Sequence, residues 1–454
     1  MVNLADLLDQ HEGKTLEFKR DASSPVPLMK TLVAFANGPG GILLIGVEDQ
    51  TRNVIGVPEP TQLESQLANW VVDRIEPRLL PECLILPWRK KNVVLVEVFP
   101  SPLRPHYLKT EGEANGVYVR VGSTNRRADP AQVDELRRQV SGRSFDEDPL
   151  PERNWEDLDF PAASEFFAPI RKLARGDLRT LNLIVRYQNR QVPTVGGMLL
   201  FGKNRLSVFP DAQIRAAVFA GTDRTTILDS QELTSHLPRA LEEAIAFIQR
   251  NTRRAVQVAG IRNVKVPDFP LVALREAVIN AVVHADYSQH GAPLRVAIFS
   301  DRIEIENPGG LPPGLTLEEV RQGVSKLRNR VVGRVFHELG LIEQWGSGIQ
   351  RMTKACLQAG LPEPILQEIG SGFRVTFRLN PGSRPELGRL DQEILDLLKG
   401  SSGLSTSQIA SGIKRTPRAA RDRIRRLLGL KLIIGHGSSL NDPTKVFRLP
   451  NEKA

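Results

Sequence analysis

The sequence predicts a multidomain protein of the α+β class. The chain has 454 residues, which is too long for a single hydrophobic core of ordinary size. Short apolar strands alternate with amphipathic helices along most of its length, as in α+β and α/β domains. Two segments rich in proline and charge, at residues 147–161 and 381–388, interrupt this alternation and predict linkers.

The composition is that of a soluble globular protein, with 41% hydrophobic and 25% charged residues. A formal net charge of +9 favours a polyanionic partner. The two cysteines, Cys83 and Cys356, are far apart and have no His or Cys at ligand spacing, so neither a disulfide framework nor a zinc site is predicted. No apolar run approaches membrane-spanning length, so we expect a cytoplasmic protein that does not bind membranes.

The first predicted domain covers residues 1–128. A helix at about residues 3–11 precedes a short strand in TLEFKR. A helix that ends in AFAN, a glycine-rich turn and the apolar strand ILLIGVED follow, and a hairpin that ends in GVYVRVGS closes the domain. These elements predict one α+β domain of normal size.

These motifs resemble the Schlafen AlbA_2 domain, named for its likeness to a nucleic-acid-binding chromatin protein. The resemblance implies an α+β fold that binds DNA or RNA. We expect phosphate contacts from basic residues near the closing hairpin, because such side chains follow a nucleic-acid backbone. These are Arg120, Arg126, Arg127 and Lys109, with His106 and Tyr107 as neighbours. A solvated basic face is the alternative.

Some members of the Schlafen family are RNA endonucleases that hold a divalent metal with acidic residues. The matching positions here are Glu12, Glu17 and Asp49, with Lys19 beside them. Clustered carboxylates bind Mg²⁺ or Mn²⁺ and activate water for phosphodiester cleavage. The alternative is structural, because Glu17 and Lys19 lie on the same face of a strand and can pair.

Residues 129–160 are predicted as a linker, and residues 161–265 as an α/β connecting region without an interpretable motif. The next predicted domain, residues 266–382, opens with the helix LVALREAVINAVVHADYS, in which Glu276, Asn280 and His284 recur every four residues on one face. At a phosphate, Asn280 suits an oxygen ligand of Mg²⁺, and Glu276 suits the base that orients water. A solvated polar stripe is the alternative.

Two glycine-bearing loops follow, ENPGGLP at residues 306–312 and GSGI at residues 346–349. Glycines let backbone amides approach phosphates. The ordered set resembles the ATP-binding superfamily of gyrase, Hsp90, histidine kinases and MutL (GHKL), in the RecG C-terminal-like variant. The resemblance implies an α/β sandwich that binds ATP and Mg²⁺.

The same resemblance assigns roles to individual residues. Glu276 takes the position of the catalytic base, Asn280 that of the metal ligand, and Glu306 that of the acid that reads the adenine amino group. The other positions expected in the pocket are Gly310, Gly346, Ser347, Gly348 and Thr376. Glu306 replaces the usual Asp and Pro308 replaces the first glycine, which favours weak binding or slow turnover.

The last predicted domain covers residues 386–452. Three helices, RLDQEILDLLK, STSQIASGI and TPRAARDRIRRLLGL, precede a hairpin, and this order resembles a winged helix-turn-helix domain. In such domains the third helix enters the major groove of DNA. We expect Arg418, Arg421 and Arg425 to contact DNA, with Arg423 and Arg426 beside them. Protein contact or dimerisation is the alternative.

Together the domains resemble a family of prokaryotic transcriptional regulators. We therefore predict a homodimeric regulator that binds ATP and DNA, and whose nucleic-acid affinity is tuned by nucleotide. The alternatives are a metal-dependent Schlafen-like endonuclease in defence or stress response and an interaction scaffold with degenerate sites. The sequence is compatible with slow ATP hydrolysis and with nuclease activity. The sequence has no Walker A string, so a helicase motor is not expected.

Overall fold

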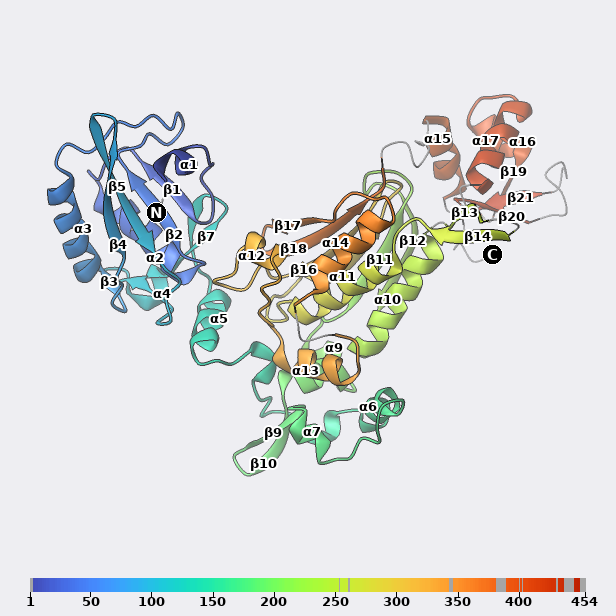
Figure 1. Ribbon diagram of the computed structural model, residues 1–454. Helices are drawn as coiled ribbons and strands as arrows, with labels where there is room; N and C mark the ends of the chain where they lie inside the picture. Colours follow the sequence, from blue (N-terminus) through green and yellow to red (C-terminus); the bar gives the residue numbers. More distant parts are fainter. Residues whose placement is uncertain are drawn as a thin grey trace. The chain divides into compact units, whose positions relative to one another are not determined.

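The computed structural model describes residues 3–252, 254–259, 262–342, 346–380, 389–399, 401, 403–429, 432–436 and 445–449. They form two compact units, whose elements are labelled in Figure 1. Unit 1 contains Met1–Asp148 and Gly310–Arg330, and unit 2 contains Pro149–Gly309 and Val331–Ala454. None of the helices within the described residues is long and apolar enough to span a bilayer.

Unit 1 is built on a sheet in the order β1-β2-β5-β4, in which β1 and β2 are parallel and the other pairs antiparallel. Its strands are β1 (Leu16–Lys19), β2 (Gly41–Ile45), β4 (Glu82–Trp88) and β5 (Lys91–Val98). Successive side chains point to opposite faces. Leu43 and Val94 pack in the core with α2 (Pro25–Asn37) and α3 (Pro60–Arg74), while Leu44 packs in the core with α1 (Leu4–Leu8).

The end of α2 shows what the AFAN and Gly-Gly motifs do. Asn37 is fully buried, and its Nδ2 donates to the carbonyl oxygens of His106 at 2.9 Å and Tyr118 at 3.0 Å. Gly40 has a φ of +87°, and a Cβ there would lie 2.6 Å from the carbonyl oxygen of Val98. Both motifs therefore join α2 to the rest of unit 1.

Smaller elements complete the N-terminal part of unit 1: β3 (Ile75–Glu76), β6 (Tyr107–Leu108), α4 (Gly112–Gly116), β7 (Tyr118–Val121), β8 (Thr124–Arg127), α5 (Pro130–Val140) and η1 (Phe145–Glu147). Helix α5 lies in residues 129–160, which we predicted as a linker. It begins with a capping box between Asp129 and Gln132, and Val133 and Leu136 pack into a small core. The prediction missed α5 because this apolar stripe is so narrow.

Gly310–Arg330 is the second segment of unit 1, and it contains α12 (Leu317–Arg321). Nη2 of Arg328 lies 3.0 Å from Oε1 of Glu135 on α5, and the backbone N–H of Arg330 donates to Oδ1 of Asp146 at 2.9 Å. A piece of the predicted nucleotide-binding domain therefore packs with the N-terminal unit. These contacts join residues far apart in the chain, so no local pattern predicts them.

Unit 2 is built on a mixed sheet in the order β12-β11-β15-β16-β18-β17. Its strands are β11 (Ile214–Phe219), β12 (Ile227–Leu233), β15 (Leu294–Ile298), β16 (Arg302–Pro308), β17 (Ile365–Ile369) and β18 (Gly372–Arg378). Strand β11, from the predicted connecting region, pairs in parallel with β15. The expected boundary at residue 265 therefore divides a continuous sheet. Figure 1 shows α10 (Leu237–Asn251), α11 (Leu271–His284) and α14 (Gly348–Gln358) on one face of it.

Further elements of unit 2 surround this sandwich: η2 (Trp155–Asp157), α6 (Phe160–Phe167), α7 (Asp177–Thr180), β9 (Ile184–Tyr187), β10 (Arg190–Pro193), α8 (Val195–Phe201), α9 (Arg205–Val208), β13 (Arg254–Ala259), β14 (Arg262–Pro267) and α13 (Arg330–Glu338). All residues of α8 are buried, and its Thr194 N-cap accepts a hydrogen bond from Gly197 N. The predicted connecting region is thus a packed part of unit 2.

The C-terminal part of unit 2 contains α15 (Arg389–Leu398), β19 (Leu404–Ser405), α16 (Thr406–Gly412), α17 (Pro417–Gly429), β20 (Ile434–His436) and β21 (Val446–Arg448). The strands pair in the order β19-β21-β20. Ile394, Ile409, Ile424 and Phe447 are fully buried in one core. The tip of the predicted hairpin, residues 437–444, lies outside the described residues.

Candidate nucleotide and nucleic-acid sites

Helices α11 and α14 bring Glu276 and Gly348 together. Helix α11 buries its apolar stripe, while Glu276 and Asn280 are half-buried one turn apart on another face. A Cβ at Gly348 would lie 2.1 Å from Oε1 of Glu276, so this carboxylate lies directly against the first turn of α14. Oε2 of Glu276 also accepts a hydrogen bond from Nη2 of Arg351 at 2.9 Å.

The first turn of α14 has the backbone geometry of an anion site. Gly346 has a φ of +65°, and Ser347, the N-cap, makes no side-chain capping hydrogen bond. The N–H groups of a first helical turn lack partners within the helix, and the helix dipole favours negative charge there. The oxygens of Glu276 and Asn280 are hard ligands of the kind that Mg²⁺ prefers. The residues present thus fit a magnesium-bound phosphate.

Strand β16 determines which residue of the ENPGG loop points toward α11. Ile303 and Ile305 are buried on the apolar face of the sheet, which packs against the helices, and Asn307 shares that face by the two-residue period of a strand. The backbone N–H of Asp286, just after α11, donates to the carbonyl oxygen of Pro308 at 2.8 Å. Asn307 and the end of β16 therefore adjoin α11.

Glu306 lies on the face of the sheet opposite to that of Ile303, Ile305 and Asn307, where arginines surround its carboxylate. Its Oε1 accepts hydrogen bonds from Arg374 Nε at 2.6 Å and from Arg224 Nη2 at 2.7 Å. Thr376 is the cross-strand partner of Glu304 and lies on that same face, buried in the sheet. Because side chains alternate along a strand, Glu306 and Thr376 share one face of the sheet and Asn307 lies on the other.

The two glycines of the ENPGGLP loop, Gly309 and Gly310, differ in backbone conformation and in the unit to which they belong. Gly309 has a φ of +87°, which suits glycine, whereas Gly310 begins the segment that belongs to unit 1. The alternation of Ile303, Ile305 and Asn307 in the sequence indicates that Asn307 shares the face of the two isoleucines.

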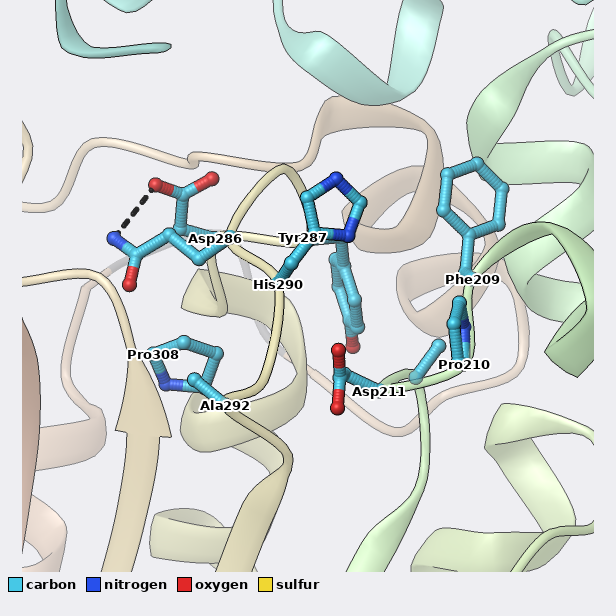
Figure 2. Close-up of a pocket in the computed structure, with 10 residues that line it drawn as sticks. Phe209, Pro210, Asp211, Asp286, Tyr287, His290, Ala292 and Pro308 are labelled. Carbon is cyan, nitrogen blue, oxygen red and sulfur yellow. Dashed lines mark hydrogen bonds between the residues drawn. The ribbon is translucent and has the colours of Figure 1, made fainter. Parts of the chain in front are cut away.

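A small hollow lies beside the end of β16, with space of about 10 Å³, and it opens to solvent (Figure 2). Its lining residues are Phe209, Pro210, Asp211, Ala212, Asp286, Tyr287, Gln289, His290, Ala292 and Pro308. Oδ2 of Asp211 accepts from the backbone N–H of Gly291 at 2.6 Å, and Oδ2 of Asp286 accepts from Nε2 of Gln289 at 3.0 Å. The hollow has room for about one water molecule, so it is too small to hold a ligand group in this conformation.

In unit 1 the structure brings the predicted acidic residues together. Glu12 lies close to Glu17 and Asp49, and its Oε1 accepts a hydrogen bond from the backbone N–H of Phe18 at 2.7 Å. Burial, together with the nearby charges of Glu17 and Asp49, raises the pKa of Glu12 to about 7, although the Phe18 hydrogen bond opposes this shift. The Glu12 carboxyl therefore keeps its proton to a higher pH than an ordinary glutamate.

Both carboxylate oxygens of Glu17 are already paired with cations. Oε2 accepts from Nη1 of Arg120 at 2.7 Å, and Oε1 pairs with Nζ of Lys19. The Arg120 side chain is only 2% exposed, and it stacks on Phe35 and donates to the carbonyl oxygen of Gly13 at 2.6 Å. Arg120 is therefore buried and paired, which contradicts its predicted phosphate contact.

The acidic residues do not fit the metal centre that the Schlafen resemblance implies. Within the described residues, no group of three or more His, Cys, Asp or Glu side chains is arranged to hold a metal ion. The two cations on Glu17 already balance its negative charge and hold both oxygens in place, which weakens its attraction for a metal ion. The structural alternative, in which Glu17 and Lys19 pair, describes the observed contact.

We expect Glu12→Gln to stabilise unit 1 more at about pH 8 than at about pH 5. The folded-state pKa of Glu12, about 7, lies above its ordinary value of 4.5. The native carboxyl therefore keeps its proton where the unfolded chain has lost it, and its contribution to stability falls as pH rises between these values. Glutamine removes this linkage. Urea unfolding at both pH values measures the difference in free energy of unfolding between Glu12→Gln and wild type. The same difference at both pH values would contradict the prediction.

The other predicted basic residues of unit 1 divide by exposure. Arg126 and Arg127 are exposed on β8, and Arg127 lies 3.7 Å from Glu111. His106 is fully buried, with Nε2 2.6 Å from Oγ of Ser101, so it offers no stacking surface. Burial lowers the pKa of His106 below its ordinary value.

The arginines of α17 also fall into two groups. Arg418, Arg421 and Arg425 are exposed, and their spacing places them along one face of the helix. Arg423 and Arg426 instead lie 3.5 Å and 3.3 Å from Oδ2 of Asp391, a fully buried carboxylate on α15. The latter two therefore tie α17 to α15.

Comparison with known proteins identifies two domains. The family model described as "Schlafen, AlbA_2" matches residues 12–129, and the one described as "Putative ATP-dependent DNA helicase recG C-terminal" matches residues 291–377. No curated protein matches. These comparisons agree with the sequence resemblances for both domains.

Two solved structures are similar to this chain. The DIP2311 protein from Corynebacterium diphtheriae is 22% identical, with 96% of this chain and 92% of that chain covered and a TM-score of 0.45. The N-terminal domain of a "Putative ATP-dependent DNA Helicase RecG-related Protein" from Nitrosomonas europaea is 30% identical. That match covers 28% of this chain and 95% of the other, with a TM-score of 0.23.

Proposed function

We propose that this chain, which contains a Schlafen AlbA_2 domain and a RecG C-terminal-like ATPase domain, is a transcriptional regulator whose DNA affinity depends on bound ATP. One observation carries the nucleotide part of this proposal. The carboxylate of Glu276 lies against Gly348 in the first turn of α14, and Gly346 directly precedes the N-cap of that helix. Asn280 lies on the next turn of α11.

In this proposal each residue acts according to its position. The first-turn N–H groups of α14 bind phosphate oxygens, and the side-chain carbonyl of Asn280 holds Mg²⁺, which neutralises phosphate charge. Glu276 orients the attacking water. Asn307 replaces Glu306 at the adenine end, because it lies on the face of β16 that adjoins α11.

The C-terminal part supports the DNA-binding half of the proposal. Its order of helices and strands, with β19 between α15 and α16, suits a winged helix-turn-helix in which α17 enters the major groove. The exposed Arg418, Arg421 and Arg425 would reach phosphates and base edges. The endonuclease alternative has less support, because cations already pair with Glu17.

We expect wild-type protein to bind Mg²⁺-ATP in calorimetry, and Asn280→Ala to bind it at least about tenfold more weakly. The substitution removes the proposed metal ligand from α11 without altering the apolar stripe. Val272→Ala is the matched control, because Val272 lies on the same helix and is 61% exposed. Equal affinities for wild type and Asn280→Ala would exclude the proposed role of Asn280.

DNA binding by the same proteins, measured with and without ATP, tests the coupling. A shift in DNA affinity with ATP in wild type, absent in Asn280→Ala, is the result expected of a nucleotide-dependent regulator. If wild type binds DNA equally with and without ATP, the two sites are independent and the regulatory proposal fails.

A further inference from the structure

Two cationic side chains of unit 1 converge on one point beside Gly314. Gly314 lies in the Gly310–Arg330 segment and has a φ of +81°. A Cβ at this position would lie 3.0 Å and 3.1 Å from Nη2 and Nη1 of Arg104, and 3.4 Å from Nζ of Lys326. The guanidinium and the ammonium therefore face the same small volume.

The polar contacts of these two side chains are all with neutral oxygens. Arg104 donates from Nε to the carbonyl oxygen of Ser101 at 2.8 Å and from Nη1 to Oε1 of Gln139 at 3.4 Å. Lys326 donates to the carbonyl oxygen of Pro313 at 3.5 Å. Within the described residues neither side chain forms an ion pair with a carboxylate. Two like charges therefore face each other without a counter-charge in contact.

The pKa shifts of Arg104 and Lys326 are also consistent with two cations that lack a counter-charge. Burial lowers the pKa of Arg104. Burial, followed by the charge of Arg104, lowers the pKa of Lys326, although the more distant Glu319 partly opposes this shift. An anion between the two cations would remove this repulsion.

Arg328 adds a third cation nearby. Its partner Glu135 and the Arg104 partner Gln139 lie four residues apart on α5, so both arginines meet the same face of that helix. The Arg328 side chain is only 8% exposed. Its Nη2 pairs with Glu135, while its Nε and Nη1 are buried without a hydrogen-bond partner. The three cations thus contact a single carboxylate.

We propose that Arg104 and Lys326 form a binding site for a backbone phosphate of double-stranded DNA, and that the charge of the buried Arg328 adds to the attraction. Guanidinium groups bind phosphate oxygens through paired N–H donors, and a lysine adds a point charge. The site belongs to unit 1, which also contains residues 12–129 that match the Schlafen AlbA_2 model, so a nucleic-acid phosphate is the favoured occupant. This inference rests on the proposed DNA-binding function and adds a contact outside α17.

Lys326→Gln tests this site by two effects of opposite direction. We expect it to weaken binding of a short DNA duplex roughly threefold and to reduce the salt dependence of binding by about one phosphate contact. We also expect a higher melting temperature, because the repulsion with Arg104 is lost. A residue with a purely structural role would not show this combination. Lys90→Gln, an exposed lysine between β4 and β5, is the control and should change neither quantity.

These measurements are best made in a protein that also carries Arg418→Gln, Arg421→Gln and Arg425→Gln, so that α17 contributes little to binding. Unchanged DNA affinity and salt dependence in Lys326→Gln would overturn the proposal. A loss of ATP affinity with unchanged DNA affinity would overturn the choice of DNA as the source of the phosphate.

Inorganic phosphate separates this inference from the function on which it rests. We expect phosphate to raise the melting temperature of wild type more than that of Lys326→Gln, because it binds the folded site. If wild type fails to bind DNA but shows this difference, the anion site stands and the DNA-binding function fails. Equal shifts in the two proteins would exclude the site itself.

Discussion

Glu17→Ala is expected to lower the free energy of unfolding of unit 1 by roughly 3–5 kcal/mol. The Glu17 side chain is 8% exposed and its partner Arg120 only 2%, so the substitution leaves a buried guanidinium without its carboxylate. The Arg120 contacts with the Gly13 carbonyl and with Oδ1 of Asn125 satisfy N–H groups but do not neutralise the charge. Urea unfolding monitored by circular dichroism measures the loss.

Glu48→Ala is the matched control for this prediction. Glu48 pairs with Arg20 at 3.5 Å, and the Arg20 side chain is 66% exposed, so removal of this pair should cost less than about 1 kcal/mol. A loss for Glu17→Ala no larger than that for Glu48→Ala would show that the Glu17 to Arg120 pair contributes little. The Glu17→Ala, Arg120→Met double variant should lose less than Glu17→Ala alone, because no unpaired charge stays buried.

This result also bears on any test of nuclease activity. A Glu17 variant that lost cleavage through unfolding would imitate the loss of a catalytic carboxylate. Asp49 is exposed, so Asp49→Asn tests the acidic cluster with less risk to the fold. Cleavage that depends on a divalent metal and is lost in folded Asp49→Asn would favour the endonuclease alternative.

The triple variant Arg418→Gln, Arg421→Gln, Arg425→Gln is expected to weaken DNA binding at least about a hundredfold at moderate salt. The three side chains are exposed along one face of α17, and each phosphate contact contributes about one unit to the slope of log affinity against log salt. Fluorescence anisotropy over a range of salt concentrations should therefore show a slope smaller by up to about three units.

Arg423→Gln, Arg426→Gln is the matched control on the same helix. These arginines contact the buried Asp391, so the double variant should destabilise the C-terminal part of the chain and leave the salt dependence of DNA binding nearly unchanged. If both variants reduced the slope equally, the division of α17 into a DNA-binding face and a structural face would be wrong.

The sequence by itself identified the features that depend on local geometry. The period of α11 placed Glu276 and Asn280 on one face, because side-chain direction repeats every 3.6 residues in a helix. The resemblance of the motifs in residues 10–125 to the Schlafen AlbA_2 domain agrees with the family model that matches residues 12–129. The GSGI segment lies at the N-terminal end of α14, with Ser347 as the N-cap, and this helix was not predicted from the sequence.

Only the tertiary structure decided how these elements combine. It showed that β11 and β15 share one sheet, that Gly310–Arg330 belongs to unit 1, and that Arg120 is buried with Glu17, which lies 103 residues away. It also assigned Glu306 and Asn307 to opposite faces of β16, where an offset of one residue reverses the side chain. Such pairings depend on packing between distant segments, and no local period in the chain encodes them.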